Sequence, residues 1–311
     1  MRELQLLGAI SELLTPASAS TLKSVGDDAA VSLHSGPIAT SVDQTVAGVH
    51  ADMGHFTHED FGWRSVATAI SDLAAMGAVP AEVLLALALP VDTSEADARS
   101  LLAGADAAAV ASGARIIGGD IVSSPTLSAA VTVIGTQQEE QQFTSRDGAC
   151  AGDLVGVTGD LGASAAGLIQ LRAGVTDELS LRHRRPTPRT LEGQALARAG
   201  VSSMIDISDG IATDAGHLGR ASSVRLLIDL PSLPIGLGVA EVASQAGIDP
   251  FALATCGGED FELLFTATRE VADLIGTSIA GTQVSWIGSA VEGEPGTDLA
   301  EKNLTGWEHG A

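Results

Sequence analysis

In the first half of the chain, short apolar runs of strand length alternate with longer runs that have the periodicity of a helix. This alternation restricts the possible folds more strongly than any other feature of the sequence. Thr57, with Asp60 three residues later, marks the start of the first long helix, and Gly77 marks its end. The order of elements is β-β-α-β-α-β-β, which indicates an α+β domain. The sequence predicts strands at 29–33, 38–42, 83–89, 115–117 and 127–134, and helices at 58–76 and 94–111.

A polar stretch at 137–151 separates this region from a second one of the same character. A chain of 311 residues is too long for one ordinary core, so we expect an N-terminal domain over 1–137 and a C-terminal α/β domain over 148–311. The fold class is α+β, with two α/β domains. The second region predicts strands at 154–157, 224–228, 261–265 and 284–287, and helices at 161–173, 190–199, 210–221 and 239–246.

The charge balance restricts the partners. The chain has 39 acidic and 16 basic side chains, a formal charge of −23, which disfavours nucleic acid and anionic membrane surfaces. A nucleotide would need divalent ions to bridge its phosphates to the protein. Cys150 and Cys256 form no metal or redox motif, and no apolar run reaches the roughly 18 residues that span a bilayer. We therefore expect a cytoplasmic protein.

Several carboxylates stand beside predicted strands. Asp28 precedes one strand, Asp43 ends the next, and Asp120 follows a third. Each alone is more often a turn residue. Because the ends of neighbouring strands lie together, we expect these three acids to converge on one rim.

Asp72 lies among apolar residues in the last two turns of the first long helix. A carboxylate there faces the negative end of the helix dipole, which costs up to about 1 kcal/mol. It is either a solvated residue on the outer face or a ligand of a bound cation, and we favour the ligand.

The second region repeats this theme. Asp206 lies inside an apolar strand, whereas Ser208 or Asp209 could simply cap the following helix. Glu259 and Asp260 follow two glycines. The turn at 158–162 could cradle a phosphate, although that motif is weak alone.

Hard oxygen ligands without a cluster of Cys or His indicate Mg²⁺ rather than zinc. The chain has neither a GxxxxGK[ST] loop nor the protein-kinase motifs, so any ATP chemistry uses another architecture.

Eight motifs in fixed order resemble those of the thiamine-monophosphate kinase family, within the superfamily of aminoimidazole ribonucleotide synthetase. The resemblance covers nearly the whole chain. The motifs are Gly26-Asp-Asp-Ala-Ala-Val31, Ser41-Val-Asp43 with Gly48-Val-His50, Ser71-Asp-Leu-Ala-Ala-Met-Gly77, Gly118-Gly-Asp120, Val157-Thr-Gly159, Arg185-Pro-Thr-Pro-Arg189, Ile205-Asp-Ile-Ser-Asp-Gly210 and Gly257-Gly-Glu-Asp260.

The resemblance implies that the N-terminal domain binds ATP and Mg²⁺ and forms a barrel across a homodimer. It also implies roles for individual residues. The implied metal ligands are Asp28, Ser41, Val42 (through its carbonyl), Asp43, Asp72, Asp120, Asp206 and Asp209. The implied ATP contacts are Gly119, Asp120, Arg146 and Ser208, and the implied thiamine contacts are His50, Glu259 and Trp307.

The implied reaction is direct transfer of the ATP γ-phosphoryl group to thiamine phosphate, giving thiamine diphosphate, with no catalytic side chain beyond the metal ligands. Arg146 is either a cationic helper or a solvated loop arginine, and Arg185 and Arg189 meet phosphate or belong to a helix entry. Two alternatives remain, namely another member of the superfamily, such as aminoimidazole ribonucleotide synthetase, and a catalytically silent nucleotide-binding regulator.

Overall fold

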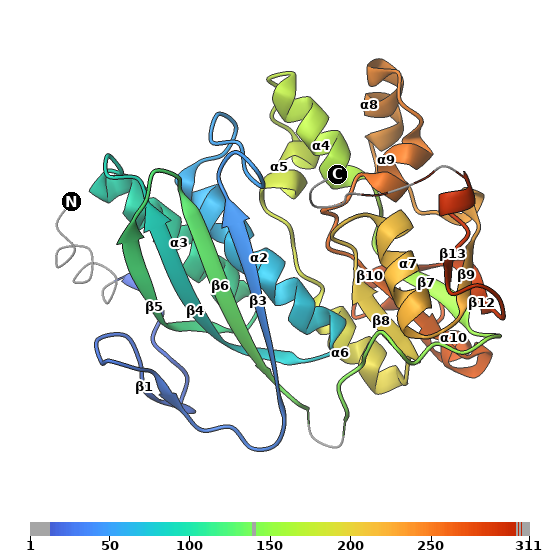
Figure 1. Ribbon diagram of the computed structural model, residues 1–311, viewed down its shortest axis with the longest axis horizontal. Coiled ribbons are helices and arrows are strands. Elements are labelled where there is room, and N and C mark those ends of the chain that lie inside the picture. Colours follow the sequence, from blue (N-terminus) through green and yellow to red (C-terminus); the bar gives the residue numbers. More distant parts are fainter. Residues whose placement is uncertain (1–12, 139–140, 303, 305, 307–311) are drawn as a thin grey trace. The chain divides into compact units, whose positions relative to one another are not determined.

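The computed structural model describes residues 13–138, 141–302, 304 and 306, and the chain divides into two compact units (Figure 1). The N-terminal unit contains the described residues up to 73 together with 78–138. The C-terminal unit contains 74–77 and the described residues from 141 onward, and so starts earlier than the expected 148. No helix in these described ranges is long and apolar enough to cross a membrane.

The N-terminal unit is built on a four-stranded sheet of order β3-β6-β4-β5. In this sheet β6 is antiparallel to both of its neighbours, and β4 is parallel to β5. The elements are β1 (Thr21–Lys23), β2 (Val31–Ser32), β3 (Ile38–Val46), α2 (His58–Ala75), β4 (Val79–Leu89), α3 (Glu95–Ala111), β5 (Arg115–Ser123) and β6 (Ser128–Thr136).

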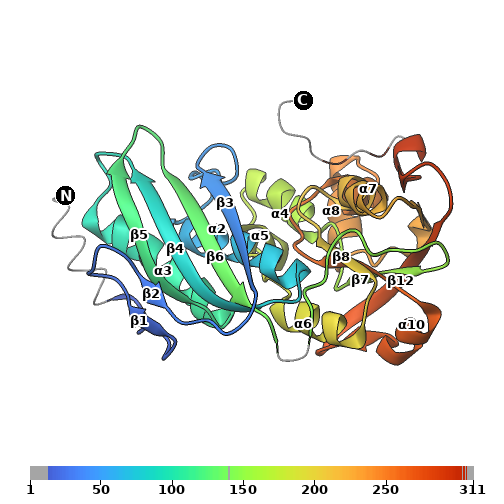
Figure 2. The ribbon, with the colours of Figure 1, turned by 60° about the horizontal axis from the view of Figure 1, so that its bottom comes forward.

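Helices α2 and α3 cover one face of this sheet, which we call the helical face; the opposite face is the open face (Figures 1 and 2). Alternate residues of β4 and β6, such as Leu85 and Val131, are buried on the helical face. The two helices cross closely at Gly62 and Gly104. A Cβ atom at Gly62 would lie 1.9 Å from the carbonyl oxygen of Leu101, so only glycine permits this crossing.

The structure confirms the predicted start of α2. Thr57 Oγ1 accepts a hydrogen bond from the Asp60 amide (3.1 Å), and the Asp60 carboxylate accepts one from the Thr57 amide (3.2 Å), which forms a capping box. The first two predicted strands, at 29–33 and 38–42, do not pair with each other. The strand β2 pairs with β1, with Thr21 opposite Ser32, and β3 pairs with β6.

Two predicted strands are too short. The strand β3 extends past 42 to Val46, and β5 extends past 117 to Ser123, so Asp43 and Asp120 lie inside strands. The prediction ended the first strand before Asp43 and the second before the glycine pair Gly118-Gly119. Because one side of each strand is partly solvent-exposed, polar side chains are tolerated within it.

The C-terminal unit contains a second sheet, along which the strands run β13-β9-β12-β7-β10-β8, with β11 paired to β12. Its strands are β7 (Leu154–Thr158), β8 (Ser203–Asp206), β9 (Arg225–Ile228), β10 (Leu263–Ala267), β11 (Ser278–Ile279), β12 (Thr282–Val291) and β13 (Gly296–Thr297). Its helices are α4 (Ala163–Arg172), α5 (Glu178–Arg184), α6 (Thr190–Ala199), α7 (Ile211–Ala221), α8 (Val239–Ala246), α9 (Pro250–Cys256) and α10 (Arg269–Ile275), with 3-10 turns η1 (Leu230–Ser232) and η2 (Ala300–Lys302).

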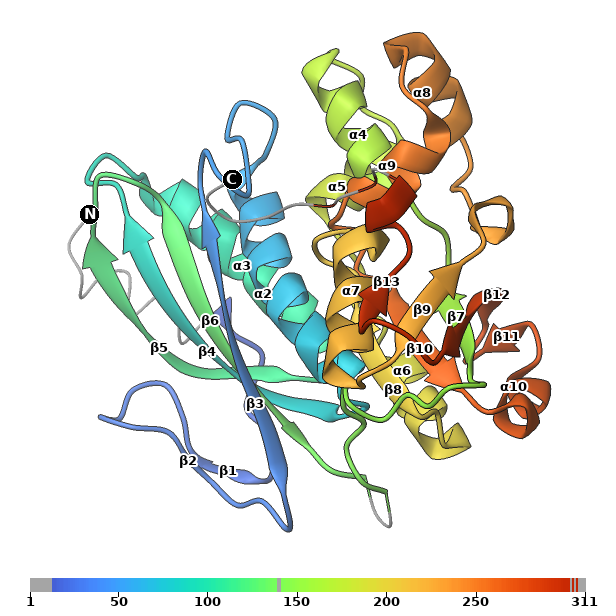
Figure 3. The same cartoon turned by 45° about the vertical axis from the view of Figure 1, so that its right-hand side comes forward.

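Three apolar clusters hold this unit together. Leu218 of α7 packs with Val155 and Leu264 of the sheet in the first cluster, and Leu196 of α6 packs with Phe265 in the second. Helices α4, α8 and α9 form the third cluster, and Figure 3 shows them together at one end of the sheet. The sequence did not predict α5, α9 and α10, because helices of seven residues are too short to show a helical period.

Candidate functional site

On the helical face of the N-terminal unit, Ser41 of β3 donates a hydrogen bond from its hydroxyl to the carboxylate of Asp72 in α2. Asp43 lies two residues beyond Ser41 and so points to the same face. Three of the predicted metal ligands therefore lie on one side of the sheet, and Asp72 is half-buried there.

Asp120 lies on the opposite side. The strand pairing places Asp43 level with Gly119 and Asp120 level with Gln44, and successive residues of a strand point to opposite faces. Asp120 therefore faces the open face. With Asp28 it lines a cavity of about 980 Å³, whose floor includes Ala86 and Thr132 of the sheet.

The expectation that Asp28, Asp43, Asp72 and Asp120 meet in one cleft is therefore not met within a single chain. Among the described residues, no group of three or more Asp, Glu, His or Cys side chains is close enough to hold a metal ion. The reason is the period of two along a strand, which separates residues 43 and 120 once both lie inside strands.

Glu82 holds the segment that carries Asp28, a role that sequence reasoning missed. This glutamate is 1% exposed at the start of β4. Its carboxylate accepts hydrogen bonds from the hydroxyls of Thr21 (2.9 Å) and Ser32, and lies 3.0 Å from Nε2 of His34. Because Asp28 lies between β1 and β2, this buried carboxylate ties both flanks of its loop to the sheet.

In the C-terminal unit, acidic side chains gather at the end of β8. Asp206 is buried at the last position of β8, and the carboxylate of Asp214 in α7 accepts a hydrogen bond from the Asp209 amide (3.1 Å). Burial and, after it, the negative charges of Asp206 and Asp209 together raise the pKa of Asp214 to about 8, while the hydrogen bond from the Asp209 amide and the charge of Arg146 act in the opposite direction. Carboxylates have the donor chemistry and charge that suit a divalent cation, although within the described residues these three do not lie close enough together to hold one.

Capping of α7 does not explain the presence of the acidic residues at the end of β8. The N-cap of α7 is Gly210, which has no side chain with which to cap the helix. Sequence reasoning missed Asp214, although a carboxylate three residues after Ile211 and four before Leu218, on the apolar side of the helix, could have signalled it.

Glu259 and Ser208 lie side by side. The Glu259 amide donates to the Ser208 carbonyl (2.7 Å), the Phe261 amide to the Ile207 carbonyl (2.9 Å), and the Ile207 amide to the Glu262 carbonyl (2.8 Å). The structure therefore joins the turn after Asp206 to the segment that carries Glu259.

The turn at 158–162 is not a vacant phosphate cradle. The Asp260 carboxylate accepts hydrogen bonds from the amides of Gly162 (2.7 Å) and Ser164 (3.0 Å). Arg189 binds both oxygens of Glu262, which is fully buried. This contact supports the structural interpretation of Arg189 over a phosphate contact.

The structure also places the remaining predicted residues, except Trp307. His50 Nδ1 accepts a hydrogen bond from the Val46 amide (3.0 Å), and the Val42 side chain is exposed on the open face. Arg146 is exposed, and its carbonyl accepts a hydrogen bond from the hydroxyl of Ser222 (2.7 Å). Trp307 lies outside the described residues.

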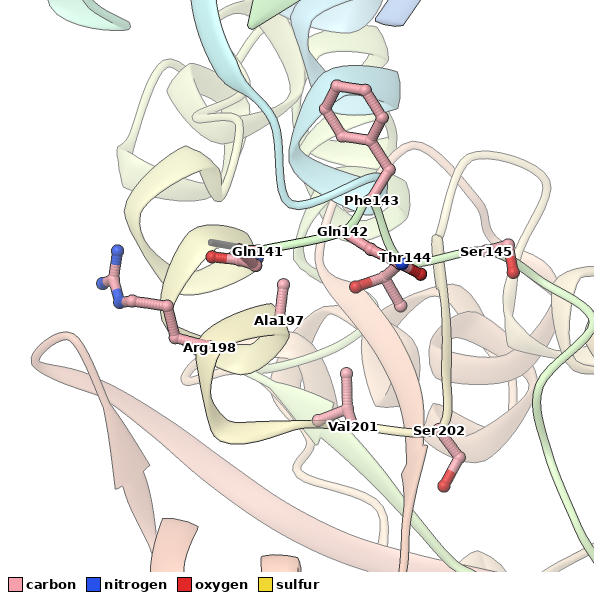
Figure 4. Close-up of a pocket in the computed structure, with 9 residues that line it drawn as sticks. All are labelled: Gln141, Gln142, Phe143, Thr144, Ser145, Ala197, Arg198, Val201 and Ser202. Atoms are coloured by element: carbon pink, nitrogen blue, oxygen red, sulfur yellow. The ribbon is translucent and has the colours of Figure 1, made fainter. Parts of the chain in front are cut away.

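A further pocket of about 430 Å³ contains none of the predicted site residues. Figure 4 shows the nine residues that line it, which come from 141–145, the end of α6 and the turn after it. We assign no role to it.

The comparisons with known proteins agree with each other. Residues 26–137 match the family model "AIR synthase related protein, N-terminal domain". The chain is 34% identical over 293 residues to the thiamine-monophosphate kinase of Mycobacterium tuberculosis (strain ATCC 25618 / H37Rv), a match that covers 93% of this chain and 85% of that one.

Solved structures show the same relationship. The thiamine-monophosphate kinase of Stenotrophomonas maltophilia K279a superposes with a TM-score of 0.81 and 32% identity, covering 95% of each chain. A structure described as AaThiL complexed with AMPPCP and TMP superposes with a TM-score of 0.77 and 30% identity, covering 84% of this chain and 82% of that one. On the extent and identity of these matches, the chain belongs to the thiamine-monophosphate kinase family.

Proposed function

We propose that this protein is a thiamine-phosphate kinase, which uses ATP and Mg²⁺ to convert thiamine phosphate to thiamine diphosphate. The observation that carries the proposal is the family membership, together with the presence of every acid that the family motifs require. A relative with 30% identity is described in complex with AMPPCP and TMP, which supports the same pair of substrates here.

In the proposed reaction, a phosphate oxygen of thiamine phosphate attacks the γ-phosphorus of ATP. The bond from that phosphorus to the β–γ bridging oxygen breaks, and ADP leaves. The attacking oxygen is already anionic, so the chain needs no general base. Bound Mg²⁺ supplies neutralisation of the phosphate charges and stabilises the charge that develops in the transition state.

The residues fit a divalent cation by their donor chemistry. In the N-terminal unit, Asp72 and Ser41 present oxygen atoms in direct contact, with Asp43 on the same face. In the C-terminal unit, Asp206 and Asp209 lie near Asp214, whose pKa is raised first by burial and then by the negative charges of these two neighbours. We propose that these carboxylates, together with Asp28, Asp120 and the Val42 carbonyl, hold the metal ions.

The proposed substrate contacts follow the same assignment. Gly119, Asp120, Arg146 and Ser208 contact the nucleotide in this proposal. His50, Glu259 and Trp307 contact the thiamine moiety. Glu259 lines a cavity of about 260 Å³. Arg185, which the sequence analysis considered together with Arg189 for a phosphate contact, lines the same cavity.

The open face of the N-terminal sheet supports the proposal of a homodimer. Ile38, Val42 and Val122 are 47%, 65% and 51% exposed on that face. Side chains of this kind are typical of a surface that a second copy covers. We propose that two such sheets pair to form the barrel, and light scattering of the purified protein tests the expected mass of two chains.

A product assay tests the function directly. Protein, Mg-ATP and thiamine phosphate are incubated, and thiamine diphosphate and ADP are quantified in equal amounts if the proposal holds. A parallel reaction with formylglycinamidine ribonucleotide tests the aminoimidazole ribonucleotide synthetase alternative. ATP binding without turnover of either acceptor would support the silent regulator instead.

A further inference from the structure

The segment that carries Glu259 has an uncommon backbone. Glu259 and Phe261 have φ angles of 59° and 52°, in the left-handed region that residues with a Cβ rarely adopt. Gly258 precedes them with a φ of 65°. Such a conformation costs free energy, about 1–3 kcal/mol for each non-glycine residue, and persists only where surrounding contacts enforce it.

Asp260, between these two residues, provides one such contact. Its two carboxylate oxygens each accept one backbone hydrogen bond, Oδ2 from the Gly162 amide (2.7 Å) and Oδ1 from the Ser164 amide (3.0 Å). Gly162 is the N-cap residue of α4 and has no side chain to cap the helix. Asp260 therefore caps α4 from a distant position in the sequence, and the cap fixes its own backbone between Glu259 and Phe261.

His183 of α5 reaches the same place from another side. The imidazole is 4% exposed, and its Nδ1 lies 3.0 Å from the Ser164 hydroxyl and 3.6 Å from Oε2 of Glu259. Ser164 therefore connects the two supports, since its amide binds Asp260 and its hydroxyl lies at hydrogen-bond distance from His183. Asp260 therefore positions the Glu259 carboxylate through the backbone of the segment, and His183 positions it through a contact with the side chain.

We propose that Asp260 and His183 are positioning residues that fix the Glu259 carboxylate for binding thiamine phosphate. The proposal rests on the proposed function, in which Glu259 contacts the substrate. Glu259, Asp260 and Ser164 line one cavity of about 260 Å³, so Asp260 and the carboxylate that it supports border the same space. Neither positioning residue contacts the reacting phosphates in this proposal.

The first test is a double-mutant cycle between residues 259 and 260. In the Asp260→Asn variant, the NH₂ group of the side chain faces one of the two amides. The hydrogen bond to that amide is lost, and two hydrogen-bond donors then face each other. Asp260→Asn should raise KM for thiamine phosphate about tenfold, with KM for ATP unchanged and kcat changed less than about twofold.

In a Glu259→Ala background, Asp260→Asn should cause no further rise in KM, because the carboxylate that it positions is absent. A rise of equal size in both backgrounds would overturn the proposal. An unchanged KM in the single variant would overturn it as well.

The second test uses His183 and remains valid if Asp260→Asn fails to fold. His183→Leu removes the contact with Glu259 and should raise KM for thiamine phosphate about tenfold. His183→Asn keeps a polar atom near the position of Nδ1 and should return KM to within about twofold of the wild type. Equal KM values for the two variants would contradict a positioning role.

Thr268→Ala is the matched control. Thr268 accepts a hydrogen bond from the Val271 amide as the N-cap of α10, so this variant also loses a cap but should leave both KM values unchanged. A rise in its KM for thiamine phosphate equal to that of Asp260→Asn would assign the effect to general loss of stability and overturn the proposal. If the wild type makes no thiamine diphosphate, the proposed function itself fails; if only the proposed positioning is wrong, the wild type is active.

Discussion

The two units hold their acidic side chains in different ways. Asp28 and Asp120 of the N-terminal unit are exposed, and Asp43 accepts a hydrogen bond from its neighbouring amide. In the C-terminal unit, Asp214 and Glu262 are buried, at 2% and 0% exposure. Asp28 and Asp120 are therefore available to an added cation, whereas Asp214 and Glu262 already form part of the interior of their unit, as Glu82 does in the N-terminal one.

This difference shows that an acidic residue in a family motif need not be a ligand. Asp260 of the Gly-Gly-Glu-Asp motif caps α4, and Glu262, two residues beyond the motif, neutralises Arg189 and supports the fold. Burial and existing partners distinguish such residues from ligands, and the sequence alone provides neither.

The largest expected effect tests the N-terminal acids. Asp72→Asn should lower kcat by at least about 100-fold while the far-ultraviolet circular dichroism stays that of the wild type, because the amide is a poor cation ligand but fits the same space. Steady-state assays of thiamine diphosphate formation check this. The exposed Asp92→Asn is the control and should keep full activity; normal activity in Asp72→Asn would remove this residue from the metal site.

Removing the partner of a buried acid in the C-terminal unit should cause a large loss of stability. Arg189→Ala leaves the buried Glu262 without its bidentate partner, which should lower the free energy of unfolding by about 3–5 kcal/mol. Urea denaturation measures it. The exposed pair Lys23–Asp27 of the N-terminal unit provides the contrast, and Lys23→Ala should change stability by less than about 1 kcal/mol. Equal effects would contradict the comparison.

A smaller effect concerns pH. The pKa of Asp214 is about 8 in the folded protein and close to 3.8 in the unfolded chain, so the folded state binds the proton more tightly. The contribution of this group to stability is complete below about pH 4 and is lost as the pH rises through about 8. Asp214→Asn should therefore raise stability more at pH 8.5 than at pH 5.

Urea denaturation of the protein in EDTA at these two pH values measures the difference. Magnesium is excluded because a cation bound beside Asp206 or Asp209 would favour the ionised carboxylate. An identical gain at both pH values would show that Asp214 does not titrate in this range.

The smallest expected effect is on stability at the exposed acids. Asp120→Asn should change the free energy of unfolding by less than about 0.5 kcal/mol, because the side chain bonds only locally to the Ile121 amide. Thermal unfolding without ligand checks this. A loss of several kcal/mol would place Asp120 among the structural acids.

Much of the fold could be predicted from the sequence. The apolar stripe of α2 and its capping box gave the helix with its first turn, and α6 and α8 lie where their periodicity predicts them. The pairing of β2 with β1 could not be predicted, because two short polar strands carry no pattern that selects a partner. The ends of β3 and β5 were misjudged because a strand with one open face accepts polar residues.

The candidate site could be predicted in part. The sequence identified Asp206, Asp209 and Glu259 as belonging to one region, and the hydrogen bond between the Ser208 carbonyl and the Glu259 amide brings two of these segments together. It did not reveal Asp214 or Glu82, and it named Asp260 without its role as the cap of α4. The roles of Glu82 and Asp260 depend on partners far away in the sequence. The acidic residues on the strands share a site only if their side chains lie on the same face of the sheet. An error in the predicted end of one strand changes the conclusion about whether they do.

The cap that Asp260 provides has a consequence for biosynthesis. Helix α4 emerges from the ribosome almost one hundred residues before the carboxylate that completes its first turn. During that interval the amides of Gly162 and Ser164 have only water as a partner, and the start of α4 frays. We therefore expect this helix end to gain protection from amide hydrogen exchange late, only after the chain has been synthesised beyond residue 260.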